Sequence, residues 1–211
     1  MYLPPHFEET DSSQIYKLTE KVPLAILVAQ TEQGLVANHI PLMLQEKQEL
    51  LGHLPLNNDL HQLVSSVQKV LAIFRGEDAY ISPNWYPTKP IHHKHVPTWN
   101  YQVVHIYGKI YYQNEEKSKL GAVGKLTKKM EERTNGETAW RMADAPSDYL
   151  NALLENIVTF RIEITKILGK SKVSQNRETI DFDNVANVLA EQGSTHMSTR
   201  INRIKENREK G

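Results

Sequence analysis

The 211-residue sequence contains no cysteine. This absence excludes disulfide bonds, thiolate nucleophiles, zinc–thiolate centres and iron–sulfur clusters. Long apolar runs are also missing, because none approaches the ~18 residues that a membrane-spanning helix needs. The longest run, from Leu24 to Ala29, has the length of a strand. The amino terminus lacks a basic segment followed by an apolar run, so we expect no secretory signal, no membrane partner and a cytoplasmic location.

Neither sign of charge is in excess, because 25 lysines and arginines balance 25 aspartates and glutamates. A neutral chain is not expected to coat nucleic acid indiscriminately. One segment is locally basic, since the residues after Met197 include Arg200, Arg203, Lys205, Arg208 and Lys210 against two glutamates. Two interpretations stay open for residues 197–211: a solvated terminal helix, or a basic arm that contacts DNA phosphates.

The common catalytic motifs are absent as well. The sequence has no GxSxG, HExxH, GxGxxG or Walker loop, and no paired carboxylates stand out. The histidine-rich segment His92–His95 lacks the helical spacing of a zinc-binding pair. We therefore predict neither catalytic residues nor a metal site. His39, His53 and His105 fall on separate predicted strands, either as core histidines or with one of them as a haem ligand.

Most of the apolar pattern is that of short strands separated by polar turns, which is typical of sheets and barrels. Strands are predicted at 23–29, 35–44, 50–54, 69–74, 79–82, 96–112 and 158–167, with a turn at 76–78 and a long loop at 83–95. Helices are predicted at 11–20, 57–66, 115–133, 148–155 and 179–191. The fold class is mainly β with peripheral helices (α+β), as an antiparallel barrel. We expect one domain over 1–193 with a helical insertion around 114–156, followed by a basic tail over 194–211.

The predicted strand 96–112 has apolar residues on both faces, so both faces should be covered. A partner subunit is one way to cover it. The aromatic residues around this strand allow two interpretations. They form either a packed aromatic barrel with a dimer face, or a platform that stacks a planar ring and meets an anion. The donor-rich segment 170–177 is likewise either a polar exit loop or a phosphate site.

Six ordered motifs resemble the PaiB family, described as FMN-binding negative transcriptional regulators. The resemblance runs from residue 1 to about residue 190. The motifs are MYLPPHF at 1–7, LVANHIPL at 35–42, GHL at 52–54, AYISPNWY at 79–86, VPTWNYQVVH at 96–105 and SQNR at 174–177.

The resemblance implies a flavin-binding split barrel that forms a homodimer and holds FMN at the subunit interface. It also implies repression of sporulation and of extracellular protease synthesis. Alternatives are a flavin-dependent NAD(P)H oxidoreductase and a haem-binding split barrel. The implied cofactor-binding residues are Asn38, His53, Tyr80, Ser82, Trp85, Tyr86, Lys89, Thr98, Trp99, Asn100, Tyr101, Lys172, Ser174, Gln175 and Asn176.

Two positions depart from the pattern of this family. Ser171 stands where the family usually has a tryptophan, so a stacking ring is missing. The segment Leu54–Asn58 lacks the arginine that could hold a phosphate. We expect both departures to weaken FMN binding without changing the fold.

Overall fold

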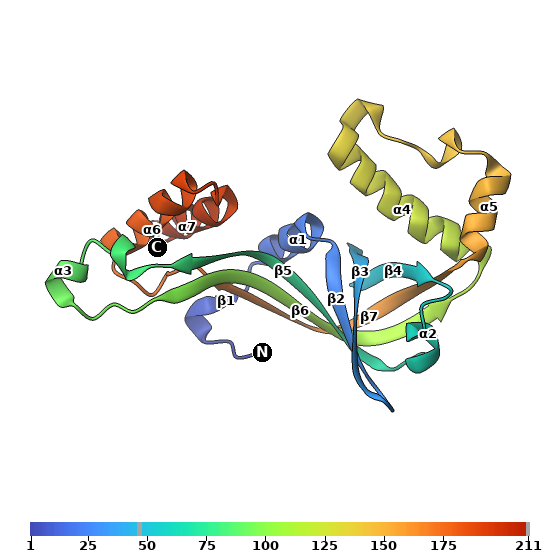
Figure 1. The fold of residues 1–211 in the computed structure, drawn as a ribbon, viewed down its shortest axis with the longest axis horizontal. Coiled ribbons are helices and arrows are strands. Elements are labelled where there is room, and N and C mark those ends of the chain that lie inside the picture. Colours follow the sequence, from blue (N-terminus) through green and yellow to red (C-terminus); the bar gives the residue numbers. More distant parts are fainter. Residues whose placement is uncertain (46–47, 210–211) are drawn as a thin grey trace. The chain divides into compact units, whose positions relative to one another are not determined.

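The computed structural model describes residues 1–45 and 48–209 (Figure 1). Its strands are Glu8–Glu9 (β1), Leu24–Thr31 (β2), Gly34–Gln45 (β3), Glu49–Pro55 (β4), Lys69–Ile81 (β5), Thr98–Gln113 (β6) and Ile157–Lys172 (β7). Its α-helices are Ser12–Lys21 (α1), Leu60–Leu63 (α2), Lys89–His92 (α3), Glu116–Asn135 (α4), Ser147–Glu155 (α5), Thr179–Glu191 (α6) and Thr195–Glu209 (α7). Short 3-10 helices are Pro5–Phe7 (η1), Pro83–Trp85 (η2), Gly136–Thr138 (η3) and Met142–Asp144 (η4).

The strand order is β1-β7-β4-β3-β2-β5-β6, and an additional pairing joins β7 to β6. That last pairing closes six strands into a barrel, with β1 added to the edge of β7. The registers are antiparallel, as in Leu42 opposite Gly52 and Gly52 opposite Phe160. The predicted antiparallel barrel is therefore present. Within the described residues, no helix combines the length and apolar character needed to cross a bilayer.

The chain divides into two compact units. Unit 1 comprises Met1–Leu18, Arg75–Val104 and Leu168–Gly211, and unit 2 comprises Thr19–Phe74 and His105–Ile167. Unit 2 contains a core of fully buried aliphatic and aromatic side chains from facing strands, among them Leu27, Leu42, Leu50, Phe74 and Phe160. The alternating burial along β2 shows one strand face turned into this core.

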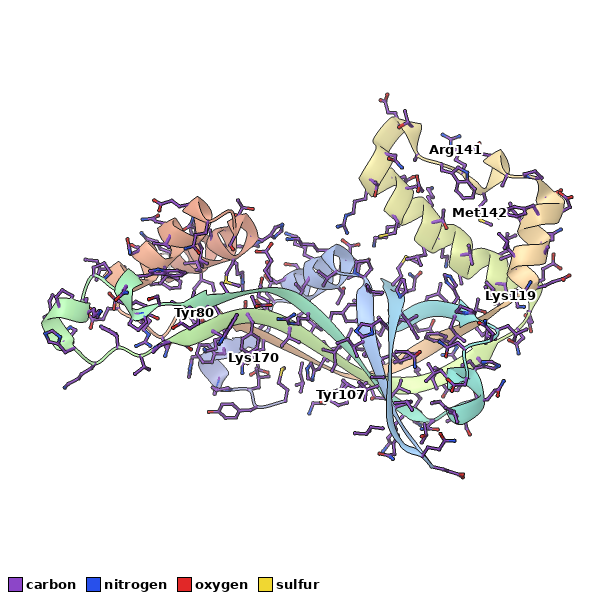
Figure 2. The ribbon with its side chains drawn as sticks, viewed as in Figure 1. Tyr80, Tyr107, Lys119, Arg141, Met142 and Lys170 are labelled. Atoms are coloured by element: carbon purple, nitrogen blue, oxygen red, sulfur yellow. The ribbon has the colours of Figure 1, made fainter. Side chains whose placement is uncertain are left out.

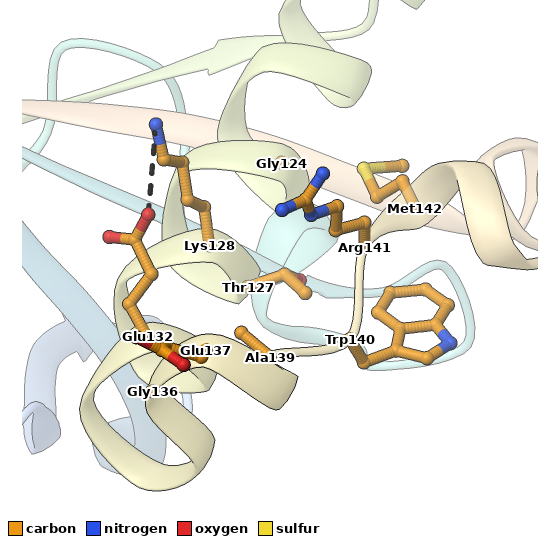
Figure 3. A pocket seen from close by; sticks show the side chains of 10 residues that line it. All are labelled: Gly124, Thr127, Lys128, Glu132, Gly136, Glu137, Ala139, Trp140, Arg141 and Met142. Atoms are coloured by element: carbon orange, nitrogen blue, oxygen red, sulfur yellow. Dashed lines mark ion pairs between the residues drawn. The ribbon is translucent and has the colours of Figure 1, made fainter.

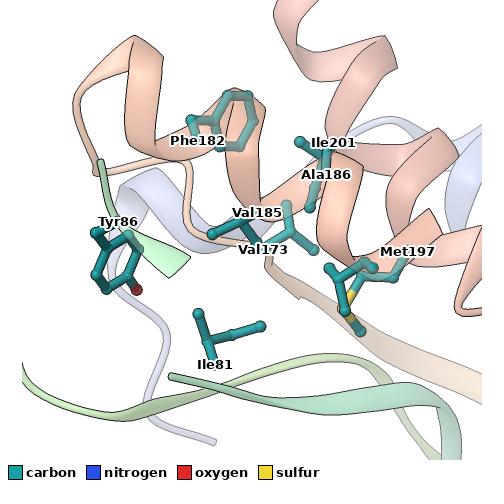
Figure 4. Close-up of a cluster of buried hydrophobic side chains, with 9 residues drawn as sticks. Ile81, Tyr86, Val173, Phe182, Val185, Ala186, Met197 and Ile201 are labelled. Atoms are coloured by element: carbon teal, nitrogen blue, oxygen red, sulfur yellow. The ribbon is translucent and has the colours of Figure 1, made fainter. Parts of the chain in front are cut away.

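The core of unit 1 joins the end of β5 to helices α6 and α7 (Figure 4). Its buried residues are Ile81, Tyr86, Val173, Phe182, Val185, Ala186, Leu189, Met197 and Ile201. They come from two parts of the sequence, 81–86 and 173–201, that are separated by more than eighty residues. Unit 1 is therefore held together by long-range apolar contacts.

Residues 195–209 differ from the separate basic tail that we expected. They form helix α7, in which Met197 and Ile201 are buried and Ile204 packs against the same core. The spacing of these three residues makes an apolar stripe along one face of a helix that is otherwise rich in basic residues. The two basic side chains nearest the stripe are also paired, Arg200 with Glu9 and Lys205 with Asp183. Residues 210–211 lie outside the described part of the chain.

The predicted turn at Gly76–Asp78 is wrong, because β5 continues through it from Lys69 to Ile81. A Cβ atom at Gly76 would lie 2.7 Å from Leu18 Cδ1 and 3.3 Å from Gln102 Cβ. Glycine is needed here for close packing rather than for a turn.

Other helix, loop and strand boundaries also differ from those predicted from the sequence. The predicted helix 57–66 is reduced to α2, and the predicted loop 83–95 contains η2 and α3. Strand β7 extends to Lys172, so the donor-rich segment begins on a strand. Helix α6 matches the predicted range 179–191, and Gly193 follows it with a φ of 82°. In the sequence, helices α4 and α5 follow β6 and precede β7, which is the range expected for the insertion.

Candidate functional site

The end of strand β7 carries a lysine that bonds to the start of β6. Lys172 Nζ donates to Thr98 Oγ1 and to the carbonyl oxygen of Trp99, both at 2.5 Å. The pKa of Lys172 is lowered by burial and by the positive charges of Lys170 and Arg177. Two members of the predicted site, Thr98 and Lys172, are therefore in direct contact.

Lys170 is a second, more deeply buried lysine on the same face of β7. Its side chain is only 6% exposed, and Nζ donates to the carbonyl of Tyr2 at 3.0 Å. The ammonium lies over the rings of Tyr2, Phe7 and Tyr101, with the nearest centroid at 5.1 Å. Among the described residues, no carboxylate pairs with Lys170 or Lys172, so both charges are balanced by carbonyls, a hydroxyl and ring faces only.

The sequence analysis omitted Lys170 from the site. The available signal was its position two residues before Lys172, since alternate residues of a strand share a face. Arg177 was also omitted, and its guanidinium lies over the Tyr86 ring at 4.9 Å from the centroid.

An exposed aromatic pair lies on strands β5 and β6. The rings of Tyr80 and Trp99 meet edge to face with centroids 5.9 Å apart. Tyr80 is 47% exposed and Trp99 is 54% exposed, so a ring face remains accessible on each. Figure 2 labels Tyr80 on β5 and Lys170 on β7. Lys172 bonds to the backbone carbonyl of Trp99, so strand β7 is joined to the residue that carries the exposed indole.

The polar residues after β7 are mostly engaged within unit 1. Asn100 Nδ2 donates to Ser174 Oγ at 2.9 Å, both residues are buried, and Ser174 has a φ of 69°. Gln175 Nε2 donates to the carbonyls of His6 and Ser171, and its Oε1 accepts from the Val173 amide. These three predicted residues therefore shape the chain around the lysines. Asn176 is exposed.

The loop after β5 is tied to itself and to the core. Ser82 Oγ accepts from the Asn84 amide at 3.2 Å, and Lys89 Nζ donates to Asn84 Oδ1 at 2.6 Å. Tyr86 is only 2% exposed, and Trp85 packs against the same apolar cluster. The structure thus gives Trp85 and Tyr86 packing roles and gives Lys89 a partner within the loop.

A buried carboxylate holds this loop to helix α6. Asp181 is fully buried and accepts hydrogen bonds from the amide and hydroxyl of Thr88, at 3.1 and 2.7 Å. His95 Nε2 lies 2.8 Å from the same hydroxyl. Within the described residues, no group of three or more histidine and acidic side chains gathers in a way that could hold a metal ion.

Asn38 and His53 belong to unit 2, whereas the other predicted site residues belong to unit 1. Asn38 Oδ1 accepts from Asn58 Nδ2 at 3.0 Å. Burial lowers the pKa of His53. The structure therefore brings together the residues of β6 and β7, and it places these two in a separate set of contacts.

Ser171, at the position of the missing tryptophan, is buried and hydrogen bonded. Its Oγ accepts from Gln102 Nε2 at 3.1 Å and from Arg200 Nε at 3.3 Å. Arg200 is paired in turn with Glu9 on β1. In place of the tryptophan that the family usually has, Ser171 forms hydrogen bonds with strand β6 and helix α7.

The arrangement suits a ligand that combines an anion with a planar ring. Two lysines without carboxylate partners favour a negative charge, and an anion would relieve the repulsion that lowers the pKa of Lys172. The exposed faces of Tyr80 and Trp99 can stack a planar ring. The residues present on β5, β6 and β7 are therefore compatible with a flavin nucleotide.

A known family model, a curated protein and several solved structures are similar to this chain. The model of the family described as "Putative FMN-binding domain" matches residues 1–166. Protease synthase and sporulation protein PAI 2 of Bacillus subtilis (strain 168) is 32% identical over 194 residues, covering 90% of this chain and 89% of that protein.

Two solved structures resemble this chain in fold. The FAD and haem binding protein from Mycobacterium smegmatis gives a TM-score of 0.56 at 15% identity, covering 78% of this chain and 73% of that one. The flavocytochrome Anf3 from Azotobacter vinelandii gives 0.57 at 12% identity, covering 78% and 69%. The likeness at these identities concerns the fold alone, and it confirms the predicted split barrel.

Proposed function

The chain belongs to this family of FMN-binding domains, and from that premise we propose that it binds FMN at the ends of β6 and β7. Lys172 would donate to the phosphate, and Trp99 and Tyr80 would offer their exposed faces to the isoalloxazine ring. Lys170 would add positive potential behind Lys172. The bound flavin would supply electron-transfer chemistry, which the protein itself lacks.

The observation that carries this proposal is the pair of lysines without carboxylate partners. Burying a cation is costly unless an opposite charge or strong acceptors surround it. Lys170 has one carbonyl and three ring faces, and Lys172 has one carbonyl, one hydroxyl and the Phe7 ring. A phosphate would turn this electrostatic cost into binding free energy.

FMN titration of the purified protein tests the proposal, with flavin fluorescence as the readout. We expect Lys172→Ala to weaken binding about tenfold or more, because a charged hydrogen bond contributes ~1.5–3 kcal/mol. Lys170→Met should weaken binding less, because its Nζ points to the Tyr2 carbonyl. Lys89→Ala is the matched control, since Lys89 is bonded to Asn84. Equal affinities for Lys172→Ala and the unchanged protein would remove this site.

For the regulatory role, we propose a flavin-dependent homodimer. The relative with 32% identity carries a name that refers to protease synthesis and sporulation. Val96, Tyr80 and Trp99 are 65%, 47% and 54% exposed, and a second copy would bury these apolar side chains. Sedimentation at several concentrations, with and without FMN, tests the assembly. A monomer under all conditions would contradict it.

Direct DNA binding through residues 197–211 stays a weaker proposal. Arg200 and Lys205 already pair with Glu9 and Asp183. Regulation through flavin occupancy, acting on a partner, therefore fits these contacts better. If changing Arg203, Arg208 and Lys210 together to glutamine abolished salt-dependent DNA retention while the protein stayed folded, the arm would be supported.

A haem site is the second candidate function, and His105 is the residue that favours it. His105 Nδ1 is buried without a hydrogen-bond partner in the described structure, and burial lowers the pKa of this side chain. Neutral imidazole is the form that ligates metal. A Soret band on haem addition that is lost in His105→Ala, but kept in His39→Ala, would support it. NAD(P)H oxidation that requires FMN and scales with protein would instead support an oxidoreductase.

A further inference from the structure

The helical insertion in unit 2 contains a cavity that the flavin proposal does not use. Its volume is about 490 Å³, within the ~300–1,000 Å³ of typical small-molecule sites. Helix α4 forms one wall with Gly124, Thr127 and Lys128 (Figure 3). The returning segment 136–142, which includes Trp140 and Arg141, forms the other.

Specific hydrogen bonds fix the returning wall. Glu131 Oε2 accepts from Asn135 Nδ2 at 2.7 Å and from the Trp140 amide at 3.0 Å. The Arg141 amide donates to Asp144 Oδ2 at 2.8 Å. The backbone on both sides of the indole is therefore anchored, so the cavity is a built feature of the insertion.

The lining combines an apolar wall with one available guanidinium. Trp140, which is 40% exposed, and Met142 both line the cavity, so a residue with an indole and a residue with a thioether border it. A Cβ at Gly124 would lie 3.4 Å from Met142 Sδ, so the glycine lets the thioether pack close to helix α4. Among the described residues, no carboxylate pairs with Arg141. Lys128 does have such a partner, since its Nζ lies 3.8 Å from Glu132 Oε1.

The charged side chains that line the cavity favour a ligand with a single negative charge. Lys128 and Arg141 are balanced by Glu132 and Glu137, all four of which line the cavity. A dianion or polyanion would meet the two glutamates, whereas a single carboxylate can pair with Arg141 through two parallel hydrogen bonds. An aromatic ring attached to that carboxylate would contact Trp140 and Met142.

We propose that this cavity binds a planar aromatic monocarboxylate, with its carboxylate on Arg141 and its ring against Trp140. The site is separate in its residues from the proposed flavin site, and it does not depend on that proposal. It would give the insertion a ligand-sensing or substrate-binding role of its own.

Calorimetric titration with benzoate, salicylate and indole-3-acetate tests the proposal. We expect saturable binding of at least one of them, and little binding of neutral benzamide. Arg141→Ala should weaken binding at least tenfold, and Arg141→Lys should restore only part, because a lysine cannot form the bidentate pair. Glu137→Gln should strengthen binding and improve acceptance of the dianion phthalate.

Two controls separate loss of the site from loss of the fold. Lys125→Ala changes an exposed cation on α4 that does not line the cavity, and it should bind like the unchanged protein. Trp140→Phe should abolish ligand-induced quenching of tryptophan fluorescence while Trp85 and Trp99 still emit. FMN affinity should be the same in Arg141→Ala and the unchanged protein. Absence of saturable binding by all three carboxylates, or binding unaffected by Arg141→Ala, would overturn the proposal.

Discussion

Two basic segments of unit 1 use their positive charges in different ways. Helix α7 pairs Arg200 with Glu9 and Lys205 with Asp183. The end of strand β7 surrounds Lys170 and Lys172 with carbonyls, a hydroxyl and aromatic rings instead. Both segments look alike in the sequence as runs rich in lysine and arginine. From this difference we infer that the proposed anion site is distinguished by cations lacking carboxylate partners, and not by the density of cations.

The largest expected effect concerns the assignment of α7 to the core. Met197→Ala and Ile201→Ala should each lower the free energy of unfolding by about 2–4 kcal/mol, because each leaves a cavity in the core. Urea unfolding monitored by circular dichroism measures this. Glu206→Ala, at an exposed position, is the control. If removing residues 195–211 left the unfolding curve unchanged, α7 would be a free arm and the comparison would fail.

The next effect concerns the ion pair that anchors α7 to β1. The side chains of Arg200 and Glu9 are only 13% and 10% exposed, so either partner left alone would be a poorly hydrated charge. We expect Arg200→Ala to cost about 2–4 kcal/mol of unfolding free energy. The double variant with Glu9→Ala should cost less than the sum of the single variants. Additive costs would mean that the two charges do not interact.

A smaller effect is expected for Lys172 on strand β7, and this effect depends on pH. The pKa of Lys172 is lowered by burial and by Lys170 and Arg177. A lysine with a lowered pKa in the folded state destabilises that state while both states are charged, and the penalty fades as pH rises from the folded to the unfolded pKa.

Lys172→Met should therefore remove this electrostatic penalty and slightly raise the free energy of unfolding at neutral pH. The difference should vanish as the pH passes the ordinary lysine value of 10.5. Unfolding curves at three pH values between neutral and strongly alkaline would measure it. A gain that increases with pH would contradict the assigned electrostatics.

The smallest effect is expected for the outer ion pair of α7. The side chains of Lys205 and Asp183 are 38% and 33% exposed, so solvent screens their attraction. Lys205→Ala should lower the free energy of unfolding by about 0.5 kcal/mol or less, and molar salt should remove the difference. If Lys205→Ala cost as much unfolding free energy as Arg200→Ala, burial would not explain how strongly the two ion pairs stabilise the protein.

Much of the barrel could be predicted because strand periodicity is local. The ranges of β2, β3 and α6 follow from alternation, polar turns and the glycine after α6. Gly76 misled the prediction, because a glycine that allows close packing looks like a glycine in a turn. Its reason lies in Leu18 and Gln102, which the local sequence does not reveal.

The site was predicted only in part for the same reason. The contact of Lys172 with Thr98 joins two motifs that the resemblance had already marked. The environment of Lys170 depends on Tyr2 and Phe7, which lie more than 160 residues earlier in the sequence. Tyr86 was expected on a ligand platform, but the α6 and α7 core encloses it. Tertiary packing decides these roles, and no short pattern encodes them.

The composition of unit 1 from three distant segments has a consequence for synthesis of the chain. Its core needs Ile81, Val173 and Ile201 together. During translation Ile81 and Tyr86 leave the ribosome long before Phe182, Val185 and Ile201, so these two early side chains have no complete cover until helices α6 and α7 follow. The nascent protein therefore passes through a period with exposed apolar side chains, and this period should make it a client of ribosome-associated chaperones.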